Sequence, residues 1–355
     1  MTDSSLFYFV NADGSGHTRR TEAILQHLKL PVVVASERPN LFKELSPQHS
    51  LHAVPPLRPG GSQQLADDVL HIPYGTERRY LPRMQAICDL CQRYRCALAV
   101  IDVCVETAMI MRLAGIPYWY MRMSGQRDDP AHLQCYRAAA GLIASYPQAF
   151  EEDWVPDWMR AKTHYGGGIF MPPPPSRTAV SDRPYILVMR GQGMSQITPA
   201  AVAIASQLVP DYRWIGIGFD TILTGANFQL LPRLPNPSPY IQQAQIVMAN
   251  AGNNSVLEVG HWRKPFIALP EWRFFDEQRA KADQLARQRL AVVLETWPER
   301  SSDWRRAIDQ AQSLAVETWG AVLSAEGAKR AAALIAQQFA EAASIPGGRQ
   351  RSPQP

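Results

Sequence analysis

The stretch Leu6–Ala35, LFYFVNADGSGHTRRTEAILQHLKLPVVVA, contains the clearest indication of the fold class. Its two ends, Leu6–Val10 and Pro31–Ala35, are short apolar runs that predict buried strands. Between them, Thr18–Leu28 has the apolar spacing of a helix, and small residues fill the loop Asn11–His17. A strand, a loop, a helix and a second strand within about 30 residues form one βαβ unit, which favours a parallel sheet.

The same alternation continues along the chain. In the first half it predicts strands at Ala97–Asp102, Tyr118–Met121 and Ala140–Ser145 and a helix at Glu106–Leu113. The run Pro172–Pro175 can continue neither a helix nor a central strand, so it predicts an extended connector. The pattern then restarts at Tyr185–Met189, Pro199–Leu208 (a helix), Tyr212–Ile217, Ile246–Ala249 and Phe266–Leu269. The chain therefore holds two α/β units.

The length of 355 residues agrees with two domains at about 150 residues each. We predict two Rossmann-like, doubly wound parallel-sheet domains that face each other across a cleft. Their expected bounds are 1–171 for the N-terminal domain, 172–183 for the linker and 184–325 for the C-terminal domain, followed by a helix at 326–343 that packs back on the first domain and a disordered tail at 344–355.

Composition excludes several classes of function. The 36 Lys and Arg against 32 Asp and Glu leave a net charge of +4, too small an excess to favour nucleic acid as the main partner. No apolar run reaches the roughly 18 residues that cross a bilayer, and no signal peptide is evident, which predicts a cytoplasmic protein. The odd count of 5 cysteines argues against a disulfide framework, and we interpret Cys88 and Cys91 as helix residues rather than zinc ligands.

Ligands of open α/β sheets bind beyond the carboxyl ends of the strands, so the loops there carry the candidate site. The first such loop holds Asp13, Gly14, Ser15, Gly16 and His17. Its glycines permit close backbone approach, and the helix N-terminus that follows favours an anion. It is not a dinucleotide fingerprint, because Arg19 stands where the third glycine belongs. The alternative is a tight turn with a capping histidine.

Three loops of the second domain complete the set. Gly191, Gln192 and Gly193 follow its first strand without the Lys-Ser/Thr pair of an NTPase loop. Gly252, Asn253, Asn254 and Ser255 open a helix whose N-terminus can hold phosphate, and Glu258 lies one turn in, where a carboxylate can accept hydrogen bonds from vicinal hydroxyls. Asp276, Gln278 and Arg279 open a further helix. Capped helices with solvated side chains are the alternative interpretation of each loop.

Taken together, these segments resemble the family 28 glycosyltransferases of GT-B fold, and among them the peptidoglycan UDP-N-acetylglucosamine transferases. The resemblance is specific over Tyr240–Leu294, in the matching segments Ala249–Glu258, Lys264–Pro270, Asp276–Gln278 and Arg289–Leu294. In the first half it is weaker, through Gly14–His17, Gly115–Pro117 and Ser145–Phe150. The chain departs from the family in having Ala12 and Asp13 at the start of the first loop and Arg279 in place of a glutamine.

The resemblance implies a role for each loop. Glu258 would bind the ribose of a UDP-sugar, Gly252–Ser255 with Gly191–Gly193 the diphosphate, and Asp276 and Gln278 the sugar. Arg233, in the loop Leu231–Leu234, would lie near uracil. His17 would be the general base or a phosphate contact, with Asp13 as the alternative base and Gly14–Gly16 on the phosphate or acceptor side. Arg279 would contact an acidic sugar or the diphosphate.

The expected activity is therefore transfer of a hexose from a UDP-sugar to an acceptor, by direct displacement with inversion. The resemblance implies no metal and no cofactor, because helix N-termini stabilise the leaving diphosphate, and no Asp-x-Asp motif occurs in a suitable loop. UDP-sugar hydrolysis and non-catalytic nucleotide-sugar binding remain as alternatives. The acceptor stays open between a lipid-linked molecule, a glycan and a small molecule; a lipid-linked one would bring the protein to the inner membrane face.

Overall fold

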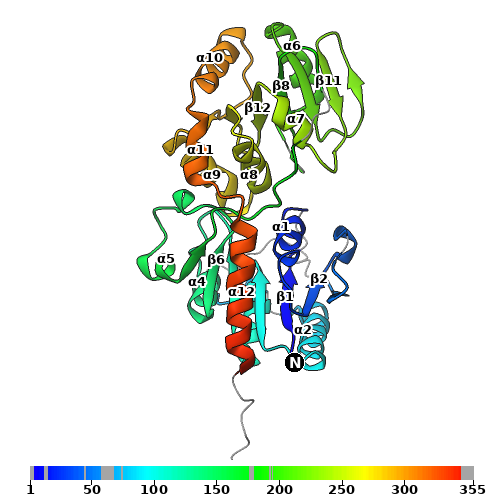
Figure 1. Ribbon diagram of the computed structural model, residues 1–355, viewed down its shortest axis with the longest axis vertical. Helices are drawn as coiled ribbons and strands as arrows, with labels where there is room; N and C mark the ends of the chain where they lie inside the picture. Colours follow the sequence, from blue (N-terminus) through cyan, green and yellow to red (C-terminus); the bar gives the residue numbers. More distant parts are fainter. Residues whose placement is uncertain are drawn as a thin grey trace, which may run out of the picture.

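The computed structural model describes residues 4–11, 15–43, 45–56, 68–72, 75–175, 180–191, 193 and 195–344. Its elements form two parallel sheets of seven strands, with the orders β3-β2-β1-β4-β5-β6-β7 and β10-β11-β9-β8-β12-β13-β14 (Figure 1). Within the second sheet, the edge pair β10–β11 is antiparallel. The predicted fold of two doubly wound α/β domains is confirmed.

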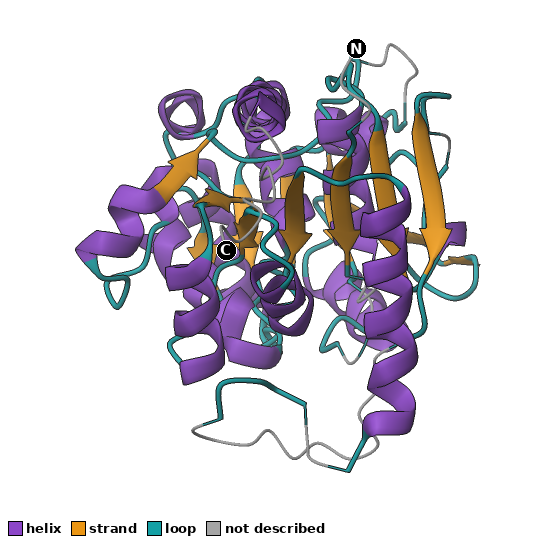
Figure 2. Ribbon diagram, turned by 90° about the horizontal axis from the view of Figure 1, so that it is seen from below, coloured by secondary structure: helices purple, strands orange, loops and turns teal. Residues whose placement is uncertain are grey.

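The first sheet comprises β1 (Leu6–Val10), β2 (Val32–Ser36), β3 (His49–Ala53), β4 (Leu98–Asp102), β5 (Tyr118–Arg122), β6 (Gly141–Ala144) and β7 (Thr163–Tyr165). Its helices are α1 (Ser15–Leu25), α2 (Glu77–Arg93), α3 (Val105–Leu113), α4 (Pro130–Ala138) and α5 (Asp157–Lys162). They cover both faces of the sheet (Figure 2). Alternation along β1 explains this arrangement: Phe7 and Phe9 enter one core with residues of α2, α3 and α4, while Leu6, Tyr8 and Val10 enter the other with α1.

The second sheet comprises β8 (Tyr185–Met189), β9 (Arg213–Ile217), β10 (Leu223–Thr224), β11 (Phe228–Leu231), β12 (Ile246–Ala249), β13 (Phe266–Ala268) and β14 (Val292–Val293). Its helices are α6 (Pro199–Leu208), α7 (Ser238–Gln243), α8 (Asn253–His261), α9 (Glu277–Arg287), α10 (Ser301–Gln312) and α11 (Trp319–Val322). The connection from β7 to β8 contains Pro172–Pro175, which lies in neither a helix nor a strand.

The last helix, α12 (Gly327–Ser344), returns to the first domain (Figure 1). Its Ala328, Ala331, Ile335 and Phe339 are buried in the core that β1 and α1 share. The start of α12 lies so close to the chain after β7 that a Cβ on Gly327 would stand 1.6 Å from the carbonyl oxygen of Gly168. Of the residues expected to form a disordered tail, those from 345 to 355 lie outside the described residues.

The bounds of one helix differ from the sequence prediction. Helix α1 spans Ser15–Leu25 instead of Thr18–Leu28, so Ser15, Gly16 and His17 form its first turn. A glycine is tolerated there because the first N–H groups of a helix have no intrahelical partner in any case. Cys88 and Cys91 lie within α2 as free thiols, as predicted. Within the described residues, no helix combines the length and the hydropathy needed to cross a membrane.

Candidate functional site

At the carboxyl edge of the first sheet, His17 meets a buried acid. Parallel pairing places Asp102, the last residue of β4, beside Val10 at the end of β1. The Nδ1 atom of His17 lies 3.2 Å from Oδ1 of Asp102, which is fully buried. Arg20, one turn further along α1 and also buried, donates to the same oxygen at 2.6 Å and lies 2.9 Å from the His17 Nδ1.

The neighbours of Asp102 hold this buried carboxyl group in its charged form. Burial raises the pKa of Asp102, but the neighbouring Arg20 and His17 outweigh it and hold the pKa below its ordinary value. Its Oδ2 has no hydrogen-bond partner among the described residues. The Nδ1 atom of His17 faces two groups: the Asp102 carboxylate can accept a proton from it, whereas the Arg20 guanidinium can only donate to its lone pair. A proton on Nδ1 that is donated to Asp102 would leave the free lone pair on Nε2.

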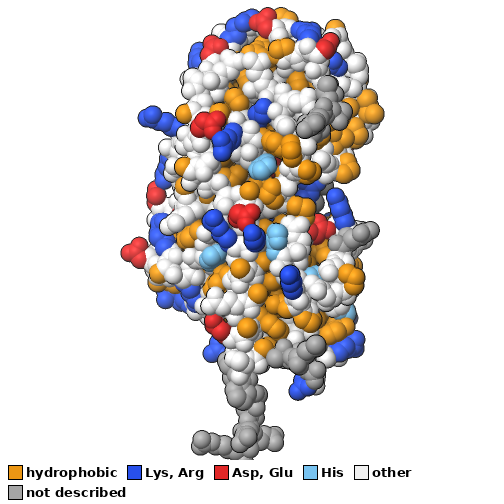
Figure 3. Space-filling view, in the orientation of Figure 1, with side chains coloured by type: hydrophobic (Ala, Val, Ile, Leu, Met, Phe, Trp, Pro, Cys, Tyr) orange, Lys and Arg blue, Asp and Glu red, His pale blue; other side chains and the backbone are white. Residues whose placement is uncertain are grey.

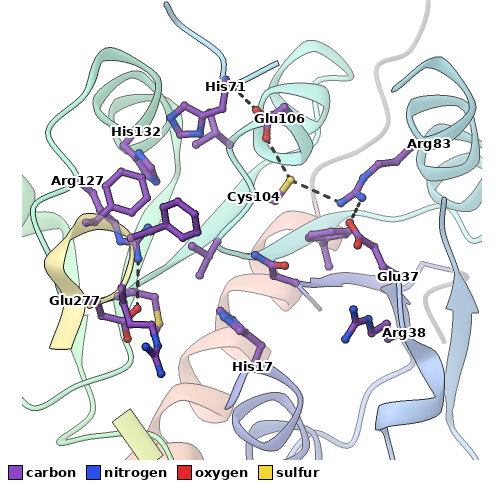
Figure 4. A pocket seen from close by; sticks show the side chains of 18 of the residues that line it. His17, Glu37, Arg38, His71, Arg83, Cys104, Glu106, Arg127, His132 and Glu277 are labelled. Atoms are coloured by element: carbon purple, nitrogen blue, oxygen red, sulfur yellow. Dashed lines mark hydrogen bonds and ion pairs between the residues drawn. The ribbon is translucent and has the colours of Figure 1, made fainter. Parts of the chain in front are cut away.

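His17 lines a cavity of about 420 Å³ between the domains (Figure 4). Residues that follow β1, β2 and β4, together with α2, form much of its wall. The remainder comes from the 123–132 region of the first domain and from 273–277 of the second. Acidic, basic and histidine side chains also gather on the surface at the junction of the two domains (Figure 3). A ligand in this cavity would touch both domains.

The contribution of the second domain comes from an irregular loop before α9. Phe275 and Asp276 adopt left-handed conformations, with φ of 60° and 49°. The carbonyl oxygen of Phe275 accepts a hydrogen bond from the Gln126 backbone N–H at 3.2 Å. The Phe275 ring lies 4.3 Å from the guanidinium carbon of Arg127 and packs edge-on against His132. These contacts attach the loop to the first domain.

The carboxyl edge of the second sheet faces the same junction. A second hollow, of about 410 Å³, lies where β8, β9 and β11 end and is lined by Arg190, Gly191, Gly193, Gly218, Phe219, Asp220 and Arg233. The backbone at Gly191 approaches Asn250 so closely that a Cβ there would lie 2.0 Å from the Asn250 amide nitrogen. A larger residue at this crossing of two predicted site loops would displace the Asn250 side chain, which donates a hydrogen bond to Glu271.

Helix α8 begins beside this hollow. Gly252 is its N-cap, and Asn253, Asn254 and Ser255 form a half-buried first turn. A Cβ on Gly16 would lie 4.0 Å from the Asn254 side chain, so the N-termini of α1 and α8 approach each other across the cleft. Two helix N-termini that converge in this way attract an anion to the space between them.

Glu258 lies one turn into α8 and faces the first domain. Its carboxylate is 3.5 Å from the guanidinium of Arg19. Burial raises the pKa of Glu258, and the positive charges of Arg19 and Arg233 only partly oppose it. Glu258 and Arg233, both predicted as donor contacts, are thus neighbours in space although 25 residues separate them in the chain.

The three residues predicted to contact the donor at the start of α9 lie in different environments. Asp276 is exposed and opens the helix, whereas Gln278 is buried and its side-chain oxygen accepts a hydrogen bond from the Glu271 N–H at 2.9 Å. Arg279 is exposed on the outer face and forms ion pairs with Glu295 and Asp283. This position does not support a donor contact for Arg279. Glu277, which the sequence prediction omitted, lines the cavity at His17 instead.

Lys281 is a further residue that the sequence prediction missed. Its side chain is fully buried, and its Nζ donates to Asn253 Oδ1 at 2.9 Å and lies 4.0 Å from Glu277. Burial lowers the pKa of Lys281 to about 8, although Glu277 opposes this shift. The amine therefore connects the start of α8 with α9. Asp102 could have been noticed as the polar end of an apolar strand; no comparable signal marked Lys281.

Some predicted residues cannot be placed. Asp13, Gly14 and Gln192 lie outside the described residues, as does the side chain of Ser15. One group in the described part of the chain could hold a metal ion, namely His71, Asp129 and His132, whose ligand atoms lie within 4.8 Å of one another. In this structure Asp129 accepts a hydrogen bond from each imidazole, at 2.9 and 2.6 Å.

The chain matches no protein-family model and no curated protein sequence. It does match solved structures. A UDP-glucosyltransferase from Polygonum tinctorium capable of glucosylating indoxyl superposes with a TM-score of 0.69 at 13% identity, over 95% of this chain and 99% of the other. MurG from Acinetobacter baumannii superposes with a TM-score of 0.62 at 14% sequence identity, over 94% of this chain and 99% of the other. The spinosyn rhamnosyltransferase SpnG, complexed with thymidine diphosphate, superposes with a TM-score of 0.57 at 14% sequence identity, over 96% of this chain and 98% of the other.

This protein has the GT-B fold. Each match covers at least 94% of the chain, so both sheets take part in it. At such low identity the matches show the fold alone. Most residues that line the cavity at His17 belong to the N-terminal domain, and those that line the hollow beside α8 belong to the C-terminal domain.

Proposed function

We propose that this protein is a glycosyltransferase that moves a hexose from a UDP-sugar to an acceptor bound beside His17. The observation that carries the proposal is the pairing of two sites across one cleft. An imidazole held by buried Asp102 stands on one side, and the N-terminus of α8 with Glu258 stands on the other. A base facing an anion site is the arrangement that displacement of a nucleoside diphosphate needs.

The donor would lie along the C-terminal domain. Its diphosphate would occupy the space between the N-termini of α8 and α1, where backbone N–H groups and Arg19 supply positive charge. The ribose hydroxyls would donate to Glu258, and the base would enter the hollow next to Arg233 and Phe219. Glu277 would accept hydrogen bonds from the sugar, in the role the resemblance gave to Asp276.

His17 would act as general base. In the tautomer that donates its Nδ1 proton to Asp102, the Nε2 atom can take the proton from an acceptor hydroxyl while that oxygen attacks the anomeric carbon. The bond to the β-phosphate oxygen breaks as the new glycosidic bond forms on the opposite face, so the anomeric configuration inverts. Asp102 would stabilise the imidazolium that results. No metal would be required, because the helix N-termini stabilise the departing UDP.

Calorimetry with UDP and a coupled assay of UDP release from UDP-hexoses test the proposal. We expect UDP to bind, and UDP release to proceed in EDTA. Release that depends on acceptor indicates transfer, whereas release in acceptor-free buffer at an undiminished rate indicates a hydrolase. If the protein binds UDP but releases none from any UDP-hexose, it is a binding protein and not a transferase. Loss of activity in EDTA with rescue by manganese would contradict the metal-free mechanism.

A further inference from the structure

Charged and histidine side chains form about half of the wall of the cavity beside His17, and apolar and aromatic side chains form most of the rest. Of its 19 lining residues, ten are arginines, glutamates or histidines, namely Arg38, Arg83, Arg127, Arg273, Glu37, Glu106, Glu277, His17, His71 and His132. Both signs of charge are present, with four arginines against three glutamates. Figure 4 shows several of these side chains pointing into the same space from both sides of the cavity. The wall therefore offers donors and acceptors of hydrogen bonds together.

Part of this polarity is fixed in place. Arg83 is 3% exposed and forms an ion pair with Glu37, and it also donates to the carbonyl oxygen of Pro55 at 3.1 Å. Arg127 is 7% exposed and lies 3.6 Å from Glu277. Each of the two guanidiniums keeps a buried Nε–H without a hydrogen-bond partner among the described residues. Packing and ion pairs thus hold these charged groups at the cavity before any ligand arrives.

An apolar acceptor does not suit such a wall. It would remove water from the charged groups without returning any hydrogen bond, which is costly for each group. Sites built to hydrogen-bond a hydroxyl reject an analogue that lacks it by about 10⁴–10⁵-fold. A molecule with many hydroxyls suits the wall, because each hydroxyl can donate to a carboxylate and accept from a guanidinium.

Two exposed aromatic rings extend the wall toward solvent. Phe274 lines the cavity and is 68% exposed, and Trp272, 66% exposed, packs against it with ring centroids 5.2 Å apart. Large aromatic side chains so exposed on neighbouring positions are uncommon unless they contact a ligand or partner. The C–H face of a pyranose is apolar and flat enough to pack on such rings, while its hydroxyls stay in water.

We infer that the acceptor is a saccharide of at least two units, a substrate class that rests on the proposed function. The unit whose hydroxyl reacts would enter the charged cavity and present that hydroxyl to His17. The next unit would pack on Phe274 and Trp272 at the mouth. The charged side chains of the cavity would select the first unit by its hydroxyls. The contact with the two aromatic rings would select an acceptor of two or more units.

Saturation-transfer NMR on the UDP-loaded protein tests this inference. One pool holds neutral and acidic disaccharides with their component monosaccharides, and the other holds planar phenols and indoxyl. We expect signals from disaccharides, weaker ones from monosaccharides and none from the phenols. Trp272→Ala should weaken disaccharide affinity by about 3- to 10-fold and leave monosaccharide affinity unchanged. The control Ile222→Ala removes another exposed apolar side chain, 68% exposed, and should change neither.

Binding of phenols alone, or of no saccharide while UDP still binds, would overturn the saccharide assignment and leave the transferase proposal intact. Equal effects of Trp272→Ala on disaccharides and monosaccharides would overturn the two-unit requirement. A protein that binds disaccharides but not UDP would refute the proposed function, and one that binds neither would refute both.

Discussion

Glu258 is the single residue on which nucleotide affinity should depend most. We expect Glu258→Ala to weaken UDP binding by about 1.5–3 kcal/mol, the range for hydrogen bonds to a charged group. Titration calorimetry of the folded variant measures this loss. Glu317→Ala, which removes an exposed surface glutamate paired with Arg263, is the matched control and should bind UDP as the wild type does. Unchanged UDP affinity in Glu258→Ala would reject the ribose contact.

Residue positions around a helix explain why a sequence motif does not fix the role of each of its side chains. Successive helix residues are rotated by about 100°, so neighbours in sequence face different directions. In α9, Gln278 and Lys281 face inward, whereas Arg279 points to solvent and pairs with Glu295. An ordered motif can therefore locate this helix correctly without showing which of its side chains face the cleft. The contact of His17 with Asp102 joins residues 85 positions apart, which only the pairing of β1 with β4 reveals.

At the scale of elements, Lys281 joins α9 to the start of α8, and its buried amine makes stability depend on pH. Its pKa is about 8 in the folded protein and about 10.5 in an exposed lysine. Between these values the unfolded chain binds a proton that the folded chain does not, so stability rises with pH across this window. Relative to Lys281→Met, the free energy of unfolding should rise by roughly 3 kcal/mol from pH 8 to 10.5.

Urea denaturation at several pH values measures this difference, because groups that titrate in both proteins cancel in the comparison. Lys329→Met, on an exposed lysine of α12, is the control and should leave the slope unchanged. Equal slopes for the wild type and Lys281→Met would show that the amine is not held in the low-dielectric interior.

The strands show which elements a sequence can reveal. Tyr185–Met189 and Ile246–Ala249 were predicted to the residue, because central strands of a parallel sheet are buried on both faces and appear as continuous apolar runs. The edge strands His49–Ala53 and Thr163–Tyr165 were not predicted, since they are partly exposed and carry polar residues. Edge strands therefore lack the apolar run on which the interpretation relied.

At the scale of the whole molecule, the connection between the sheets is the expected point of cleavage. The segment from Phe170 to Pro184 contains exposed Met171, and its described residues belong to no helix or strand. Limited proteolysis should cut there first, because a protease needs an accessible backbone free of regular hydrogen bonding. Mass spectrometry of the fragments locates the cut. First cleavage within Val188–Leu269 would contradict the proposed division into domains.

The two domains divide the proposed chemistry between them. His17 belongs to the first domain, whereas Glu258 and the hollow proposed for the base belong to the second, so removing the imidazole should affect turnover and largely spare nucleotide binding. The measurement is kcat for UDP release by His17→Ala, together with its UDP affinity by calorimetry. We predict that kcat falls by about 10²–10⁴-fold, the usual loss for a general base, while UDP affinity changes little. Weakened UDP binding with undiminished kcat would contradict the account and make His17 a phosphate contact.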